Sequence, residues 1–122
     1  MREVGDDLMD NCLFCRIIKG EIPSAKVYED EYVYAFKDIN PVTPVHVLVV
    51  PKVHIDSLEG LNDENIENVT HIHRGIKKVA EITGINKDGY RLIVNCGKGA
   101  GQTVFHLHYH VLGGTKMSEK II

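Results

Sequence analysis

Residues 102–114 read QTVFHLHYHVLGG and carry three of the chain's seven histidines, His106, His108 and His110, at strict two-residue spacing. In a β-strand, alternate side chains leave the same face about 6.6–7 Å apart. The three imidazoles therefore share one face of a predicted strand, and the apolar residues between them share the other. A helix would scatter the histidines around its circumference. The spacing favours a strand whose apolar side enters the core while its imidazoles line a site.

A solvated strand face, a metal site and a nucleophilic site are three interpretations of this row of histidines. Two histidines at i and i+2 on a strand can share one metal ion. Neutral imidazole is a competent nucleophile near pH 7 because its reference pKa is about 6.5, and a flanking imidazolium can stabilise the charge of a phosphate. Histidine is not a favoured surface residue in strands, which argues against the solvated face.

The segment that precedes the histidines, CGKGAGQT at residues 96–103, is rich in glycine. Gly97, Gly99 and Gly101 can adopt backbone angles closed to other residues and bring amide N–H groups close to an anion. The segment matches neither of the common glycine-rich nucleotide motifs, and a plain connecting loop is the alternative. Its position directly before three histidines favours phosphate binding.

The rest of the chain divides into short strands and one long helix. From residue 63 to 83, apolar residues recur every three or four positions, which predicts an amphipathic helix with Asn62 or Asp63 as its N-cap and Gly84 as its end. A short helical turn near the N-terminus ends at Gly20. Strand patterns, including a hairpin with an acidic turn at residues 29–31, cover residues 25–38, 45–51, 90–95 and the histidine segment. This order predicts an α+β fold with an antiparallel sheet, one long helix and a short N-terminal helix.

Length and composition are typical of one globular domain, residues 1–122, with residues 1–10 expected to form a loose polar arm. The net charge of −3 and the scattered Lys and Arg residues exclude the concentrated basic surface that a nucleic-acid duplex requires. No apolar run is long enough for a membrane span, and the N-terminus does not resemble a secretory signal. With three cysteines and no export signal, we expect reduced thiols in a cytoplasmic protein.

Cys12 and Cys15 form a C-x-x-C pair, which supplies half of a tetrahedral zinc site. A redox dithiol is the competing interpretation, but that motif normally opens a helix that follows a strand. No strand pattern precedes the pair in this chain. Zinc requires two more ligands, and histidines are present to supply them. The pair therefore favours a metal site over redox chemistry.

The segment HLHYHVL at residues 106–112 fits the pattern His-x-His-x-His-x-x, with x apolar, of the histidine-triad family. Three earlier segments resemble the same family in the same order: CLFCRIIKGEIPSAKVYEDE, AFKDINPVTPVHVLVVPKVHI and YRLIVNCGKGAGQT. The VLGG after the histidines resembles the Hint branch, the purine nucleoside phosphoramidases. The resemblance covers residues 11–117 and implies the α+β histidine-triad fold. It also implies a cytoplasmic homodimer formed by joined sheets and packed long helices.

The resemblance implies roles for the residues that match the family's motifs. His108 is the expected nucleophile, His110 contacts the phosphate, and Thr103 or a triad histidine delivers a proton to the leaving group. The expected catalytic set is His106, His108, His110 and Thr103. The residues expected to bind the nucleotide are Leu13, Phe14, Asp38, Ile39, Asn95, Gly101, Gln102, Thr103, His108 and His110. Those expected to bind a structural zinc ion are Cys12, Cys15, His54 and His106.

Within the nucleotide set, Asp38 matches an acid that binds the ribose hydroxyls, and Leu13, Phe14 and Ile39 match apolar residues near the base. These roles agree with the chemistry, because a carboxylate can accept from two vicinal hydroxyls and a purine needs a flat apolar slot. A turn-forming role for Asp38 and a core role for Phe14 are the alternatives.

The implied activity is hydrolysis of purine nucleoside 5′-phosphoramidates, in two steps, through a nucleotidyl-histidine intermediate. Two displacements combine a good nucleophile with a labile P–N bond. A dinucleoside polyphosphate hydrolase and a non-catalytic nucleotide-binding protein are the alternatives. The sequence leaves open the leaving group and the choice between adenine and guanine.

Overall fold

The computed structural model describes residues 11–122, and the predicted arm at residues 1–10 lies outside this range. Its centre is a five-stranded sheet in the order β1-β2-β3-β5-β4, in which every neighbouring pair is antiparallel. The strands are β1 (Lys26–Glu29), β2 (Val33–Lys37), β3 (Val45–Pro51), β4 (Tyr90–Ile93) and β5 (Tyr109–Gly113). The predicted α+β class with an antiparallel sheet is confirmed.

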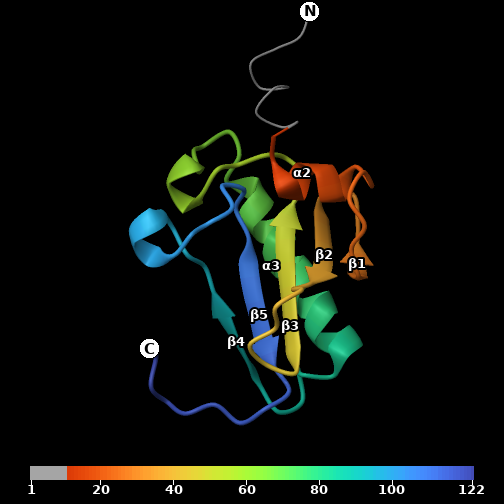
Figure 1. Cartoon of the computed structure of the whole chain (residues 1–122), viewed down its shortest axis with the longest axis vertical. Coiled ribbons are helices and arrows are strands. Elements are labelled where there is room, and N and C mark those ends of the chain that lie inside the picture. The colour runs from red at the N-terminus through yellow and green to blue at the C-terminus, as the bar shows by residue number, and fades with distance from the viewer. Residues whose placement is uncertain (1–10) are drawn as a thin grey trace, which may run out of the picture.

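Two helices cover opposite faces of this sheet (Figure 1). The long helix α3 (Glu67–Thr83) packs on the face formed by alternate residues such as Val47 and Val49, within the larger core cluster. The short helix α2 (Leu13–Ile18) packs on the other face, against residues that include Leu48. Burial on both faces explains why β3 is apolar along nearly its whole length. The described residues contain no helix long and apolar enough to cross a membrane.

The acidic turn predicted at residues 29–31 joins β1 to β2. The Asp30 carboxylate accepts hydrogen bonds from the N–H groups of Tyr32 (2.8 Å) and Val33 (2.9 Å), and the Tyr28 hydroxyl donates to it (2.7 Å). This is a side-chain mimic of a backbone turn, which aspartate forms readily. The hairpin prediction is confirmed.

The long helix begins later than its apolar pattern predicts. Residues 63–66 form turns, and α3 begins at Glu67. The Asn62 side chain accepts from the N–H groups of Glu64 and Asn65, so this predicted N-cap residue stabilises the preceding turn instead. The C-terminal end agrees with prediction, because Gly84 caps α3 with a φ of 81°, which glycine adopts at no steric cost.

The histidine segment is only partly a strand. β5 begins at Tyr109, so His106 and His108 precede it and only His110 belongs to the hydrogen-bonded ladder. The alternation of faces nevertheless continues through residues 106–108, because Leu107 is buried in the core beneath α3 while its N–H donates to the Ile55 carbonyl (2.6 Å). The predicted strand boundary was therefore wrong, and the predicted separation of the two faces is confirmed.

A glycine allows α3 to approach the sheet closely. A Cβ atom on Gly75 would lie 2.8 Å from the Val33 side chain, which is fully buried. We predict that Gly75→Ala lowers the free energy of unfolding by about 1 kcal/mol, because overpacking costs about 1–3 kcal/mol and the gain in helix propensity returns only about 1. Urea denaturation measures the change, with Lys77→Ala on the exposed face of α3 as control. A stabilised Gly75→Ala protein would contradict the tight packing.

Candidate active site and metal centre

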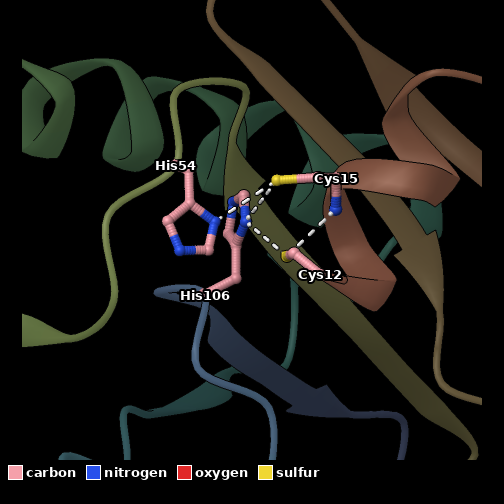
Figure 2. A group of neighbouring side chains, drawn as sticks. All are labelled: Cys12, Cys15, His54 and His106. Carbon is pink, nitrogen blue, oxygen red and sulfur yellow. Dashed lines mark hydrogen bonds between the residues drawn. The ribbon is translucent and has the colours of Figure 1, made fainter. Parts of the chain in front are cut away.

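Four side chains from three segments converge at one end of the sheet. Cys12 is the N-cap of α2 and Cys15 lies in its first turn, whereas His54 follows β3 and His106 precedes β5. Their potential ligand atoms all lie within 4.8 Å of one another. Figure 2 shows both sulfur atoms and both imidazole rings directed at a common point. The structure thus brings together all four residues predicted to bind a metal.

The ring nitrogens in this cluster are oriented for metal binding. His106 Nε2 lies 2.8 Å from the Pro51 carbonyl, which can only accept, so the proton is on Nε2 and the Nδ1 lone pair faces Cys12 Sγ at 3.3 Å. In the same way, His54 Nε2 donates to the Asp56 carboxylate (2.8 Å), and its Nδ1 faces Cys15 Sγ at 3.3 Å. A carboxylate or carbonyl partner behind the ring is typical of metal-bound histidine.

Burial dominates the protonation of this cluster. It lowers the pKa of His106 to about 4, so the imidazole is neutral at pH 7, as ligation requires. Burial, followed by the hydrogen bond to Cys12, raises the pKa of the Cys15 thiol to about 12. Both shifts disfavour charge inside the protein in the absence of a cation. The Cys12–Cys15–His54–His106 cluster could therefore hold a metal ion.

His108 lies next along the same face and is also fixed by a backbone carbonyl. Its side chain is 8% exposed, and its Nδ1 donates to the His106 carbonyl at 2.7 Å. The lone pair of the neutral ring is therefore on Nε2. Phe14 packs edge-on against the ring with centroids 5.1 Å apart. Burial lowers the pKa of His108. The geometry gives a neutral imidazole with one nitrogen held and the other available as a nucleophile.

His110 belongs to a different hydrogen-bonded chain. The Val42 N–H donates to His46 Nδ1 (3.1 Å), so the proton of the neutral His46 ring is on Nε2, which lies 2.9 Å from His110 Nδ1. The Asp38 carboxylate lies 3.4 Å from the same Nε2. Asp38, His46 and His110 also have ligand atoms close enough to share a metal. The proton on His46 Nε2 opposes ligation there, so Val42, His46 and His110 form a hydrogen-bonded chain with the Asp38 carboxylate close to its centre.

Acid should destabilise the protein partly through His110. Burial, followed by repulsion from His108 and His46, lowers its pKa from 6.5 to about 4, against the opposing effect of Asp38. As the pH falls, His110 therefore becomes protonated in the unfolded chain before it does so in the folded protein. The neutral His110 ring contributes to stability above pH 6.5, and this contribution is lost as the pH falls towards 4. We predict that the free energy of unfolding, measured by urea denaturation, falls less between pH 6.5 and 4 for His110→Gln than for wild type. Parallel profiles would contradict the assignment.

Four other residues predicted to bind the nucleotide differ in burial and in hydrogen bonding. Asp38 also accepts the Asn40 N–H (2.8 Å), so it forms the turn considered as its alternative role, while its second oxygen faces His46. Ile39 is 92% exposed, free to contact a ligand. The Asn95 amide lies beside Gly101. Phe14 is a core residue, as its alternative proposed, and it also contacts His108.

The glycine-rich loop folds back on itself before the histidines. Gly97 and Gly101 have φ values of 89° and 88°, which confirms that the loop uses backbone angles favoured by glycine, whereas Gly99 does not. The Gln102 side chain is buried inside the protein. Thr103 is exposed, and its N–H and that of Val104 donate to no acceptor among residues 11–122. The N–H groups of Phe105 and His106 have no acceptor in this range either, and successive unpaired N–H groups are suited to bind an anion.

A depression of about 490 Å³ borders the metal cluster. It brings Leu13 and Thr103 together, although they are distant in sequence, and its other lining residues are Asn11, Cys12, His54, Asp56, Val104 and Phe105. A larger hollow of about 600 Å³ at the other end of the sheet contains none of the predicted site residues.

Two contributors to the site were not predicted from the sequence. The Asp56 carboxylate accepts a hydrogen bond from His54, and the sequence pattern that could have predicted it is an acidic residue two positions after the histidine, in HID. The Pro51 carbonyl orients His106, and no side-chain motif identifies a backbone acceptor.

Comparison with known proteins agrees with this arrangement. The HIT domain family model matches residues 19–117. The chain is 40% identical over 107 residues to the purine nucleoside phosphoramidase of Escherichia coli, covering 88% of this chain and 90% of that protein. It is 47% identical over 109 residues to the 14 kDa zinc-binding protein of Zea mays, covering 87% and 84% respectively.

Among solved structures, the HIT family hydrolase from Clostridium thermocellum superposes with a TM-score of 0.91 at 57% identity, covering 93% of this chain and 98% of that one. The family match includes the β-sheet, α3 and the three histidines. The resemblance inferred from the histidine motif is thereby confirmed, and the chain belongs to the HIT domain family.

Proposed function

We propose that this protein hydrolyses purine nucleoside 5′-phosphoramidates, or related nucleotidyl conjugates, and releases a nucleoside monophosphate. The observation that carries the proposal is the orientation of His108, whose Nδ1 is hydrogen-bonded to the His106 carbonyl and whose Nε2 is left with a lone pair. Burial keeps the ring neutral, and a neutral imidazole attacks phosphorus readily. The phosphoramidase named among the relatives supports the choice of substrate.

The reaction proceeds in two displacements. His108 Nε2 forms a bond to the α-phosphorus, the P–N bond breaks, and the amine leaves with the proton that Thr103 or a triad histidine supplies. Water then attacks the nucleotidyl-histidine, which releases AMP or GMP and restores the imidazole. His46 Nε2–H donates to His110 Nδ1, so the neutral His110 ring carries its proton on Nε2 and can donate to a phosphate oxygen.

The nucleotide is held by residues on both sides of His108. The N–H group and hydroxyl of Thr103, with Gly101 and Asn95 beside it, bind the phosphate and leaving group. Asp38 accepts from the ribose hydroxyls with the oxygen that faces His46. The exposed Ile39 and Leu13 side chains and the edge of Phe14 form the apolar slot for the base. Gln102, which was also predicted to bind the nucleotide, uses its N–H and its side-chain amide in internal hydrogen bonds, so we assign it no direct contact with the phosphate.

We infer that the metal of the four-residue cluster is zinc. Zn–S and Zn–N bonds of about 2.3 and 2.0–2.1 Å in a tetrahedron place sulfur about 3.6 Å from nitrogen. The structure has S···N separations of 3.3 to 3.5 Å for Cys12–His106, Cys15–His54 and Cys15–His106. Four protein ligands leave no open position, which is typical of a structural site. Zinc would tie α2 to the segment before β5.

The substrate assignment is tested by comparing adenosine 5′-phosphoramidate with a dinucleoside polyphosphate under identical conditions. We expect release of AMP from the phosphoramidate at a rate well above that from the dinucleotide. Faster dinucleotide cleavage would favour the polyphosphate hydrolase, and AMP binding without turnover of either compound would favour a non-catalytic nucleotide-binding protein. The choice of AMP or GMP follows from repeating the assay with guanosine 5′-phosphoramidate.

We also propose that the protein is a cytoplasmic homodimer. β4 is the edge strand of the sheet beside β5, and it exposes Tyr90 and Ile93. An exposed edge strand can pair with the same strand of a second copy and so extend the sheet. Light scattering in solution should give twice the chain mass of 13.7 kDa. A monomeric mass at micromolar concentration would contradict the dimer.

A further inference from the structure

Gln102 is a polar side chain that the protein surrounds almost completely, with 3% of its surface exposed. Its Oε1 accepts the Gly97 N–H at 2.8 Å, and its Nε2 donates to the carbonyls of Asp56 (2.8 Å) and Val104 (3.1 Å). The orientation of the amide is determined, because an N–H can only donate and a carbonyl can only accept. A fully satisfied buried amide of this kind rigidifies the segments that it joins.

The same side chain connects the glycine-rich loop to the metal centre. The backbone carbonyl of Asp56 accepts a hydrogen bond from Gln102 Nε2. The Asp56 carboxylate accepts a second hydrogen bond, from His54 Nε2, at 2.8 Å. Asp56 is therefore held from two sides, by a predicted metal ligand and by Gln102. Hydrogen bonds therefore connect His54 to Asp56 and Asp56 to Gln102. Gln102 in turn binds Gly97 and Val104, which lie before and after Thr103 in the chain.

Gln102 has no hydrogen-bond donor left with which to bind a phosphate directly. All three side-chain hydrogen bonds are internal, and its backbone N–H donates to the Gly97 carbonyl at 3.1 Å. Its bonds to Gly97 and Val104 instead hold the residues on either side of Thr103. The unpaired N–H groups of Thr103 and Val104 can face a phosphate only while this bend keeps its shape.

We propose that Gln102 is a positioning residue, which holds the Thr103–Val104 bend in its phosphate-binding shape and couples that bend to the metal centre through Asp56. This role rests on the proposed function in assigning a nucleotide phosphate to the bend. This role differs from direct contact with the nucleotide, because the Gln102 side chain is buried and bonds only to other residues of the protein. Loss of its side-chain amide should weaken phosphate binding without removing any ligand-contacting group.

The test uses the metal-loaded protein and AMP as the probe. We expect Gln102→Met, which keeps a similar volume and loses all three hydrogen bonds, to weaken AMP binding about tenfold. Gln102→Glu keeps an acceptor for the Gly97 N–H but turns its other oxygen towards the carbonyls of Asp56 and Val104, so it should weaken AMP binding at least as much as Gln102→Met. The control is Asp30→Ala, which removes the hydrogen bonds of the β1–β2 turn far from the bend and should leave AMP affinity unchanged. Wild-type AMP affinity in a folded Gln102→Met protein would overturn the positioning role.

A double-mutant cycle tests the coupling to the metal centre. Asp56→Ala removes the carboxylate that holds His54 but keeps the backbone carbonyl that Gln102 binds. We expect Asp56→Ala to weaken AMP binding severalfold in the wild-type background and to have little further effect in Gln102→Met, because the path is already broken. Equal effects in the two backgrounds would overturn the coupling through Gln102.

Amide hydrogen exchange separates this proposal from the proposed function. In Gln102→Met the Gly97 amide should exchange at least about tenfold faster while amides in β3 keep their protection. This result is independent of any nucleotide, so it holds even if the wild-type protein fails to bind AMP and the proposed function is wrong. Uniformly faster exchange throughout the sheet would show that Gln102 only stabilises the fold, and would overturn the proposal.

Discussion

His108→Ala should release AMP from adenosine 5′-phosphoramidate on the order of 10⁴-fold more slowly than wild type, or not at all, because the variant lacks the atom that attacks phosphorus. Affinity for AMP should change by only a few-fold, since the Thr103 bend, Asp38 and the apolar slot remain. The His106 carbonyl loses its hydrogen-bond partner, which costs about 1 kcal/mol of stability. Single-turnover kinetics and equilibrium binding of AMP measure the two quantities separately.

The matched control is His73→Ala, which removes an imidazole from the exposed side of α3. That ring lies 3.3 Å from the Tyr109 hydroxyl and contacts none of the proposed catalytic groups. Its turnover should equal that of wild type. If His108→Ala folded normally and retained turnover, the nucleophile would have to be another group. A nucleotidyl adduct isolated from wild type after denaturation at alkaline pH, where the P–N bond to histidine is stable, and absent from His108→Ala, would confirm the covalent step.

The second large effect concerns the metal cluster. Cys15→Ser should lower the free energy of unfolding by about 3 kcal/mol or more, because the binding free energy of a structural metal contributes directly to folding. Cys15 is buried beside Cys12 and His106, so its replacement removes a ligand and leaves a polar hydroxyl in an apolar cluster. Chelation of wild-type protein should have a similar effect. Guanidinium denaturation with and without chelator measures both losses.

Cys96→Ser is the matched control for this change. Cys96 is a half-buried free cysteine outside the cluster, so its replacement should change stability by less than about 1 kcal/mol and leave the effect of chelator intact. At saturating substrate, molecules of wild type that remain folded after chelation should retain their initial rate, because the proposed chemistry uses no metal. A Cys15→Ser protein as stable as wild type would show that the cluster holds no stabilising metal.

The two centres are linked by alternate residues of one extended segment. His106 Nδ1 faces the cysteines, and the His106 carbonyl accepts from Nδ1 of His108, which faces the proposed nucleotide site. One hydrogen bond therefore joins a proposed metal ligand to the proposed nucleophile. The Gln102 network provides a second link, to the phosphate-binding bend. The metal could thus influence nucleotide affinity while taking no part in bond breaking.

Local patterns in the sequence predicted much of the fold. Two-residue spacing separated His106, His108 and His110 from the apolar residues between them, since strand geometry depends only on the backbone. The acidic turn and Gly84 were also predictable, because each acts through its own or an adjacent backbone. The first residues of α3 and β5 were not predictable in this way. Asn62 and Asp63 could start a helix equally well by local preference, but a turn intervenes before Glu67.

The sequence by itself determined which chemistry was available: a row of imidazoles, a pair of thiols and a glycine-rich loop. The tertiary structure alone decided which nitrogen of each ring is free. His106 and His108 are alike in sequence, yet Pro51 holds Nε2 of the first and the His106 carbonyl holds Nδ1 of the second, so one presents Nδ1 to the thiols and the other Nε2 to the nucleotide site. These acceptors are backbone carbonyls, which every residue possesses. Only the packing of β3 against the segment before β5 places Pro51 beside His106, so no residue pattern could have revealed it.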